Sequence, residues 1–168
     1  MIDVRDLNFT YRKSNVAALR GLDFSAGRGE IFGFLGPSGA GKSTTQKILI
    51  GLLEGYSGSA RVRGKEVRSW TADDYERIGV SFETPNHFLK LTGLENLRYF
   101  AALYASETRQ PTALLKAVGL NEDGDKPVGQ YSRGMKCRLS IARSLYPMLW
   151  IVPAYLWSRR ALARTRNA

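Results

Sequence analysis

The sequence predicts an α/β fold from three observations. Short apolar or alternating segments typical of strands take turns along the chain with segments whose apolar residues recur at helical spacing. A glycine-rich loop stands between an apolar run and a helical pattern, as in a strand–loop–helix unit. At 43% hydrophobic and 24% charged, the 168 residues have the composition of one globular domain or part of one.

The first half of the chain alternates strand patterns with one helix pattern. Val4, Leu7 and Phe9 alternate well enough for a strand, and the apolar run Ile31–Leu35 ends at a glycine, which is typical of a buried strand. The predicted strands are Ile2–Tyr11, Ala18–Ser25, Glu30–Leu35 and Gly58–Val67, the last with a turn at Gly64. The predicted helix is Gly41–Leu53, with Ile48, Leu49 and Leu52 on one face.

The second half is mainly helical. A short strand is predicted over Ile78–Phe82, and Leu149–Val152 is a candidate for a further strand. In the last helical segment, Leu139, Ala142 and Arg143 follow Met135 at helical spacing. The predicted helices are Leu94–Tyr104, Thr112–Val118 and Ser132–Leu145.

The glycine-rich loop carries the strongest chemical signal in the chain. The pattern G-x-x-x-x-G-K-[ST] has every fixed position filled. It is matched by Gly36, Pro37, Ser38, Gly39, Ala40, Gly41, Lys42 and Ser43, and Thr44 follows it in the loop. Glycines let backbone N–H groups turn inward around an anion, and the start of a helix adds a partial positive charge. Lys42 is expected to reach the β- and γ-phosphates of a nucleotide, and the Ser43 hydroxyl to ligate Mg²⁺.

We therefore predict a P-loop NTPase that binds a nucleotide through residues 36–44, rather than a glycine-rich turn with a chance Lys-Ser pair. This loop alone does not choose among kinases, GTPases, helicases and transporters.

A second motif, Tyr131-Ser132-Arg133-Gly134-Met135-Lys136, opens the last predicted helix. Here the sequence resembles the ATP-binding cassette (ABC) family, whose signature loop is usually written L-S-G-G-Q and takes the form Y-S-x-G-M-K-x-R-L in some exporters. The resemblance covers roughly residues 1–145 and rests on both motifs in this order. An ordinary helix N-cap at Ser132 is the simpler interpretation of the second motif, and we expect both to hold.

The resemblance implies roles for several residues. Ser132 and Gly134 would face the γ-phosphate bound by a second nucleotide-binding domain, so the resemblance implies a homo- or heterodimer. Tyr11 stands where the family stacks an aromatic on adenine; a core aromatic is the alternative. Glu83 stands at the position of the family's Q-loop glutamine, which contacts Mg²⁺ and the attacking water, and a glutamate can also ligate Mg²⁺. The alternative is an exposed loop acid without a role. His87, the single histidine, is expected at a surface or interface.

The resemblance also implies an architecture and partners. We expect one nucleotide-binding domain over residues 1–145, with an antiparallel β portion at about 1–30 and 58–68 and a helical arm at about 90–140. ATP and Mg²⁺ are the expected cofactors. A transmembrane permease subunit is the expected partner, contacted near the start of the helical arm. The chain would then be cytoplasmic and peripheral to the membrane, and no apolar run in it resembles a signal peptide or membrane span.

The acidic residues that the family uses for hydrolysis are not found. After the signature helix the family has a Walker B strand that ends in Asp-Glu, and a switch histidine follows. This chain has Pro153-Ala154-Tyr155 in that region, with no acid beyond Asp125 and no histidine beyond His87. ATP hydrolysis needs positioned Mg²⁺ and a group that orients water. We therefore expect weakened Mg-ATP binding with negligible turnover from this chain.

The excess positive charge is concentrated in the C-terminal quarter of the chain, the same region that lacks the expected acidic residues. All 15 acidic residues lie between Asp3 and Asp125, where 16 Lys and Arg balance them, whereas the last 43 residues carry nine Lys and Arg and no acid. The formal charge of +10 therefore does not describe the whole domain, and nucleic acid is not an expected partner. One cysteine excludes an internal disulfide framework and fits a reducing compartment.

Residues 146–168 form an atypical basic tail, and an out-of-frame reading of a GC-rich gene is one hypothesis for it. Arg159-Arg160-Ala161 can be encoded CGA-CGA-GCC, which in a shifted frame yields Asp-Glu followed by proline. A core without its last strands would expose strand edges, so we expect poor solubility or dependence on a partner. Three functions stay open: the ATP-binding subunit of a transporter, a non-hydrolysing ATP-binding scaffold, and a nucleic-acid-associated ABC ATPase.

Overall fold

The computed structural model describes residues 1–30, 32–81, 86–105, 108–146 and 149–151. The chain divides into two compact units, Met1–Asp73 and Asp74–Ala168. None of the helices in the described part of the chain is both long and apolar enough to cross a membrane.

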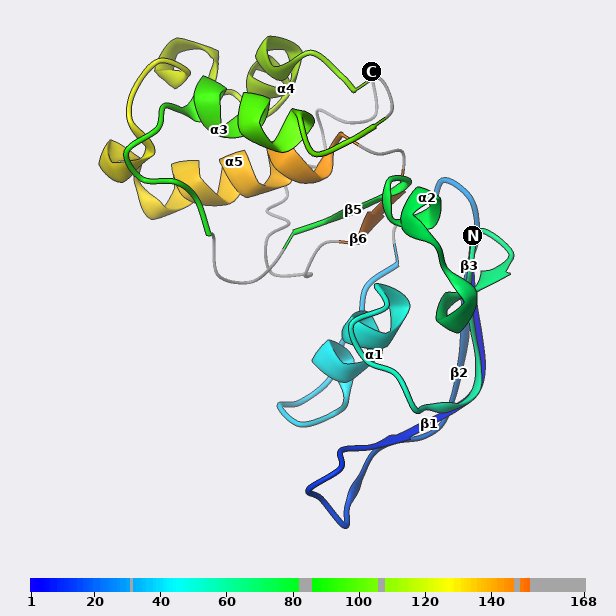
Figure 1. Cartoon of the computed structure of the whole chain (residues 1–168). Coiled ribbons are helices and arrows are strands. Elements are labelled where there is room, and N and C mark those ends of the chain that lie inside the picture. The colour runs from blue at the N-terminus through cyan, green and yellow to red at the C-terminus, as the bar shows by residue number, and fades with distance from the viewer. Residues whose placement is uncertain (31, 82–85, 106–107, 147–148, 152–168) are drawn as a thin grey trace. The chain divides into compact units, whose positions relative to one another are not determined.

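The first unit is built on the predicted antiparallel sheet (Figure 1). Ile2 pairs with Ala26 on one side and with Val62 on the other, so the first strand lies in the interior of the sheet. The turn at Gly64 is confirmed as a two-residue hairpin with positive φ at both Arg63 and Gly64. The strand order is β2-β1-β3-β4, with β1 at Ile2–Thr10, β2 at Ala17–Ala26, β3 at Ser57–Val62 and β4 at Lys65–Glu66.

A bulge explains why both Val4 and Leu7 are fully buried although they are three residues apart in β1. Strict alternation would place them on opposite faces of the sheet. Between them β1 contains one residue more than either neighbouring strand, and Asp6 has a φ of 44°. The Asp6 N–H donates to the Asp23 carboxylate at 3.0 Å, which holds the bulge in place.

Helix α1 (Lys42–Leu49) confirms the helix predicted after the glycine-rich loop, but it is shorter than expected. Ile48 and Leu49 are buried. Leu52 is 58% exposed, so the prediction that it shares one helix face with them is wrong. The reason is the helix end: Gly51 adopts a left-handed φ of 72°, which turns the chain away before Leu52.

The strand predicted at Glu30–Leu35 is not formed over Phe32–Leu35, where the chain is irregular. A buried parallel strand needs a neighbour that exchanges backbone hydrogen bonds with it, and no described residue pairs with this segment. The aromatic rings hold it instead: Phe24 of β2 stacks on Phe32 and meets Phe34 edge-on, both with centroids 5.0 Å apart. Leu35 is left 92% exposed.

The second unit combines a short parallel sheet with a helical core (Figure 1). The predicted strand at Ile78–Phe82 is present as β5 (Ile78–Val80), and it pairs in parallel with β6 (Leu149–Ile151), the candidate further strand. The three predicted helices are confirmed within a few residues at each end. They are α3 at Gly93–Ala101, α4 at Pro111–Ala117 and α5 at Arg133–Ser144, and a single turn, α2 at Ala72–Tyr75, precedes β5.

Helices α3, α4 and α5 bury one apolar cluster between them, and Figure 1 shows them lying together. Leu97, Leu114 and Leu139, one from each helix, are almost completely buried. Burying such side chains is worth about 1.5–3 kcal/mol each, which makes this cluster the main source of stability in the helical part. The Tyr146 hydroxyl donates to the Leu97 carbonyl at 2.7 Å and so fastens the end of α5 to α3.

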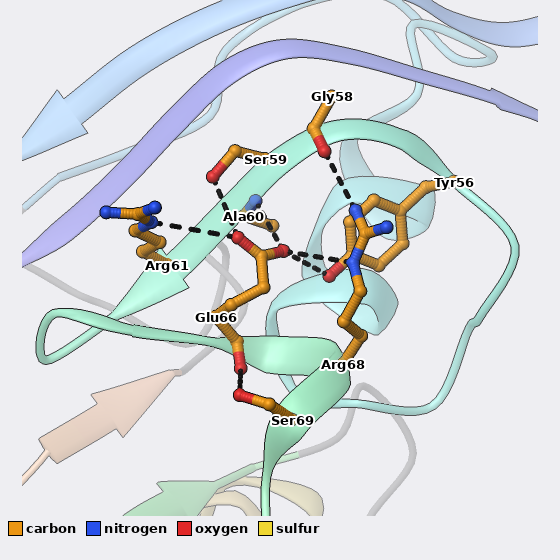
Figure 2. A network of polar contacts seen from close by, with 8 residues as sticks. All are labelled: Tyr56, Gly58, Ser59, Ala60, Arg61, Glu66, Arg68 and Ser69. Atoms are coloured by element: carbon orange, nitrogen blue, oxygen red, sulfur yellow. Dashed lines mark hydrogen bonds and ion pairs between the residues drawn. The ribbon is translucent and has the colours of Figure 1, made fainter.

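A polar network fixes the β3–β4 hairpin around the Glu66 carboxylate (Figure 2). Glu66 accepts hydrogen bonds from the Tyr56 and Ser59 hydroxyls, both at 2.8 Å, and from the Ala60 N–H at 3.1 Å. The Arg68 guanidinium lies 3.3 Å from the same carboxylate and over the Tyr56 ring, 4.4 Å from its centroid. Burial raises the pKa of Glu66, but these donors and the Arg68 charge outweigh it, so the pKa is lowered from its usual value.

Replacing Glu66 by glutamine is expected to lower the free energy of unfolding at neutral pH by about 1–2 kcal/mol, because several donors then face a neutral acceptor. A lowered pKa means that the Glu66 contribution is present above the ordinary carboxyl value and is lost as the pH falls through the folded-state pKa. The difference between wild type and Glu66→Gln should therefore shrink between pH 7 and pH 3, measured by urea unfolding. Glu54→Gln, an exposed acid in the same unit, is the control. Equal pH dependence in all three proteins would contradict this prediction.

Candidate nucleotide-binding site

The glycine-rich loop places its backbone in the open, with residues 36–40 all exposed. Gly39 and Gly41 have left-handed φ values of 83° and 81°, a conformation that favours glycine. Gly41 is also constrained by its neighbours, because a Cβ there would lie 2.5 Å from Leu19 Cδ2 and 2.8 Å from the Ala18 carbonyl oxygen. The last glycine of the loop therefore lets β2 approach the start of α1 closely.

The start of α1 is suited to an anion. Its first backbone hydrogen bond runs from the Thr45 N–H to the Gly41 carbonyl at 2.8 Å. The N–H groups at the preceding helical positions have no carbonyl within the helix to accept them, and no side chain caps this end. No acid stands in the first turn, so nothing there opposes a negative ligand.

The Lys42 ammonium group is held by the loop itself. Its Nζ donates to the Gly36 carbonyl at 2.8 Å and to the Pro37 carbonyl at 2.6 Å. Lysine has three donors on a flexible stem, so this group can turn from neutral carbonyls to the oxygens of an anion. Lys42 is thus retained beside the loop with its charge available for a phosphate.

Tyr11 lies next to the start of α1, and it is not a core residue. It follows β1, is 39% exposed and packs edge-on against Phe9 with ring centroids 4.9 Å apart. Its hydroxyl is 3.0 Å from the Thr44 Oγ1 in the first turn of α1. The structure therefore brings this predicted base-stacking residue and the phosphate loop together, a contact that no pattern in the sequence indicates.

Ser43, the predicted Mg²⁺ ligand in this unit, is exposed in the first turn of α1. Within the described ranges, no group of three or more His, Cys, Asp or Glu side chains is placed to hold a metal ion. A hydroxyl without a carboxylate cage fits a Mg²⁺ ion that arrives on nucleotide phosphates and keeps several waters. The residues of this loop thus fit a nucleotide. Among the predicted Mg²⁺ ligands, Ser43 is the one that lies in the described part of the chain.

Ser132 is confirmed as the N-cap of α5, in the second unit. Its hydroxyl accepts a hydrogen bond from the Met135 N–H at 3.2 Å. Gly134 has ample space, since the nearest atom to a Cβ there would be the Ser132 Oγ at 3.9 Å. Glycine within a helix costs about 1 kcal/mol relative to alanine, and no described neighbour requires it at this position. An open, glycine-containing helix start of this kind leaves room for a ligand or another chain.

Other predicted residues are placed differently or not described. Glu83 lies outside the described residues, as do Pro153-Ala154-Tyr155 and the rest of the basic tail from residue 152 onward. His87 is not a simple surface residue: it is half-buried, and its Nε2 lies 2.9 Å from the Lys136 carbonyl of α5. Sequence reasoning missed this contact because the two residues are far apart along the chain.

The comparisons with known proteins agree on one family. The profile of the family described as ABC transporter matches residues 19–150. A fluoroquinolones export ATP-binding protein of Mycobacterium tuberculosis is 61% identical over 145 residues, which are 86% of this chain and 48% of that protein. The lantibiotic transport ATP-binding protein SrtF of Streptococcus pyogenes is 34% identical over 145 residues, covering 86% of this chain and 61% of that protein. The chain spans about half the length of the first of these relatives.

Solved structures give the same result for the fold. An ATP-binding subunit of an ABC transporter matches with a TM-score of 0.78 at 28% identity, covering 97% of this chain and 70% of that one. A dimeric post-hydrolysis state of the ATP-binding cassette MJ0796, bound to ADP and Pi, also gives 0.78, at 23% identity, covering 98% and 79%. At that identity the second likeness establishes the fold alone. The predicted α/β phosphate-loop fold is confirmed.

Proposed function

The chain belongs to the ABC transporter family, and on that premise we propose that it is the ATP-binding subunit of an exporter. The observation that carries the proposal is the phosphate loop: an open glycine-rich backbone, an uncapped helix start and the Lys42 ammonium group meet at one place. The relative that is named for fluoroquinolones export is 61% identical to this chain, which supports a small drug-like molecule as the exported substrate.

ATP and Mg²⁺ are the proposed ligands, with the triphosphate in the loop of residues 36–44. Bound Mg²⁺ would supply charge neutralisation between phosphate oxygens, with Ser43 as its ligand and Glu83 as a second ligand and water-orienting group. Lys42 would bind the outer phosphates, and Tyr11 would stack on the base with its exposed ring. The Tyr11 contact with Thr44 supports this assignment, because it places the ring beside the loop.

A second nucleotide-binding domain and a membrane permease are the proposed partners. The open helix start at Ser132 and Gly134 supports the first, as an anion site that a phosphate on another subunit completes. An exposed apolar surface supports the second. It consists of Phe88, Leu89, Tyr99 and Leu103, each between 45% and 64% exposed, and Phe88 meets Tyr99 edge-on at 4.7 Å. The chain would then lie at the cytoplasmic face of the membrane through its permease.

The experiment that tests this function measures ATP binding and phosphate release separately on the 168-residue chain. We expect saturable Mg-ATP binding with no release above the buffer rate, because no acid follows Asp125 to serve as a Walker B pair. Binding is read by displacement of a fluorescent ATP analogue, and release by a phosphate sensor. Absence of binding would refute the nucleotide site. Robust release that Lys42→Ala abolishes would refute the proposed impairment and leave the site intact.

A further inference from the structure

His87 lies against the middle of helix α5 and contacts two of its residues. Its Nε2 is 2.9 Å from the Lys136 carbonyl oxygen and 3.0 Å from the Ser140 Oγ. The Ser140 side chain is almost completely buried. The contacts span one turn of the helix that begins at the Ser132 cap.

The contact with the Lys136 carbonyl constrains the tautomer of the ring. A carbonyl oxygen only accepts, so the hydrogen bond to Lys136 requires a proton on the His87 Nε2. In the neutral ring the Nδ1 then carries a lone pair. The Nδ1 is buried and has no hydrogen-bond partner in the described part of the chain. A second proton at this atom would therefore create a buried N–H with no acceptor among the described residues, which is unfavourable.

The residues next to His87 are attached on both sides. The Asn86 carbonyl accepts a hydrogen bond from the Arg143 guanidinium at 3.0 Å, and that guanidinium lies over the Phe100 ring of α3, 4.3 Å from its centroid. The buried Asn96 side chain of α3 bonds both backbone groups of Phe88, each at 3.0 Å. Residues 86–88 are thus tied to α3 by Asn96 and to α5 by His87 and Asn86.

We propose that neutral His87 is a positioning residue that couples the segment Asn86–Leu89 to helix α5, and through α5 to the Ser132 cap. The segment carries Phe88 and Leu89, which form half of the exposed apolar surface, and α5 carries the open helix start. Loss of the His87 contact would then loosen this segment and the first turns of α5 together. The significance of the coupling for transport rests on the proposed function, whereas the coupling itself is a property of this chain.

The charges around His87 favour the neutral ring. Burial lowers its pKa most strongly, the hydrogen bond to Lys136 raises it, and the positive charges of Arg143 and Lys136 on α5 lower it further, for a net decrease. Among the described residues, Arg143 and Lys136 are the charged groups that contribute to this lowering of the pKa. Its contribution to stability is therefore present above the ordinary histidine value and is lost as the pH falls through the lowered folded-state pKa. Mild acid should release the segment from α5.

The test uses the full chain without a polyhistidine tag. Because the sequence contains one histidine, the imidazole NMR signals belong to His87 without assignment work. We expect the tautomer protonated at Nε2 and a pKa below 6.5, the ordinary value. A ring that titrates at or above the ordinary value, or that is protonated at Nδ1 alone, would overturn the proposal.

Hydrogen exchange tests the coupling itself. At pH 7.5 we expect His87→Phe to speed exchange about ten-fold in residues 86–92 and 133–140, the change expected for losing one or two hydrogen bonds, with residues 36–49 unchanged. His87→Gln, which keeps an N–H donor, should restore slow exchange. Wild type should show the same increase at pH 5.5, after correction for intrinsic rates, while His87→Gln should not.

Two outcomes of this experiment contradict the coupling: unchanged exchange in His87→Phe, or pH dependence that is equal in wild type and His87→Gln. If His87→Phe does not fold, the pH series on wild type and His87→Gln still decides the question. ATP binding measured on the same samples separates this proposal from the proposed function. Loss of ATP binding with normal His87 behaviour refutes only the function, and the reverse result refutes only the coupling.

Discussion

Lys42→Ala is expected to weaken ATP binding by at least about 100-fold. In the structure the Lys42 Nζ is held on two loop carbonyls beside the uncapped start of α1, where it is available to phosphate oxygens. A hydrogen bond to a charged group is worth about 1.5–3 kcal/mol, and two such bonds correspond to this loss of affinity. Displacement titration of a fluorescent ATP analogue, at fixed ionic strength, measures the effect.

The matched control for this variant is Lys47→Ala. Lys47 lies in the last turn of the same helix, five residues after Lys42 and beyond the loop motif, and it is exposed. The control should bind ATP within about two-fold of wild type, because exposed charges are screened by salt. Equal weakening in both variants would indicate general electrostatic attraction rather than a phosphate site. Unchanged affinity in Lys42→Ala would contradict the site directly.

Sequence reasoning succeeded where local chemistry alone decides the backbone. The phosphate loop was predictable because Gly39 and Gly41 permit left-handed backbone that other residues avoid. Helix α5 was predictable because Ser132 caps it and Leu139 and Ala142 recur on its buried side. The hairpin at Gly64 followed from a turn residue between alternating segments. Each of these features depends on residues within one or two turns of one another.

The errors arose where the outcome depends on distant residues. The segment Phe32–Leu35 has the composition of a buried strand, but no described segment pairs with it, so its pattern alone did not make it a strand. The helical spacing of apolar residues continues to Leu52, but the left-handed backbone at Gly51 ends the helix before that residue. The contacts of Tyr11 with Thr44, and of His87 with α5, join residues 33 and 49 positions apart, and no local periodicity encodes such pairs.

The second large effect is expected on folding, from Gly79→Ala in strand β5. A Cβ at this position would overlap the backbone carbonyl oxygen of Ser144 at the end of α5 and would lie 2.8 Å from its carbon. Backbone cannot rotate away as a side chain can, so either the strand or the helix end must shift. We expect the free energy of unfolding to fall by about 3 kcal/mol or more, measured by urea unfolding followed by circular dichroism.

Gly33→Ala is the matched control, because a Cβ there meets nothing within 4 Å and its φ is not in the left-handed region. The control should unfold within about 0.5 kcal/mol of wild type. The contrast tests one feature of the fold: Gly79 permits the close approach of β5 to the C-terminal end of α5, the helix that begins at Ser132.

If Gly79→Ala is as stable as Gly33→Ala, β5 does not lie this close to Ser144, and the packing between the parallel sheet and α5 is wrong. If only Gly79→Ala is destabilised, the strand and the helix that carries the Ser132 cap form one packed unit, as any transmission of movement along α5 requires.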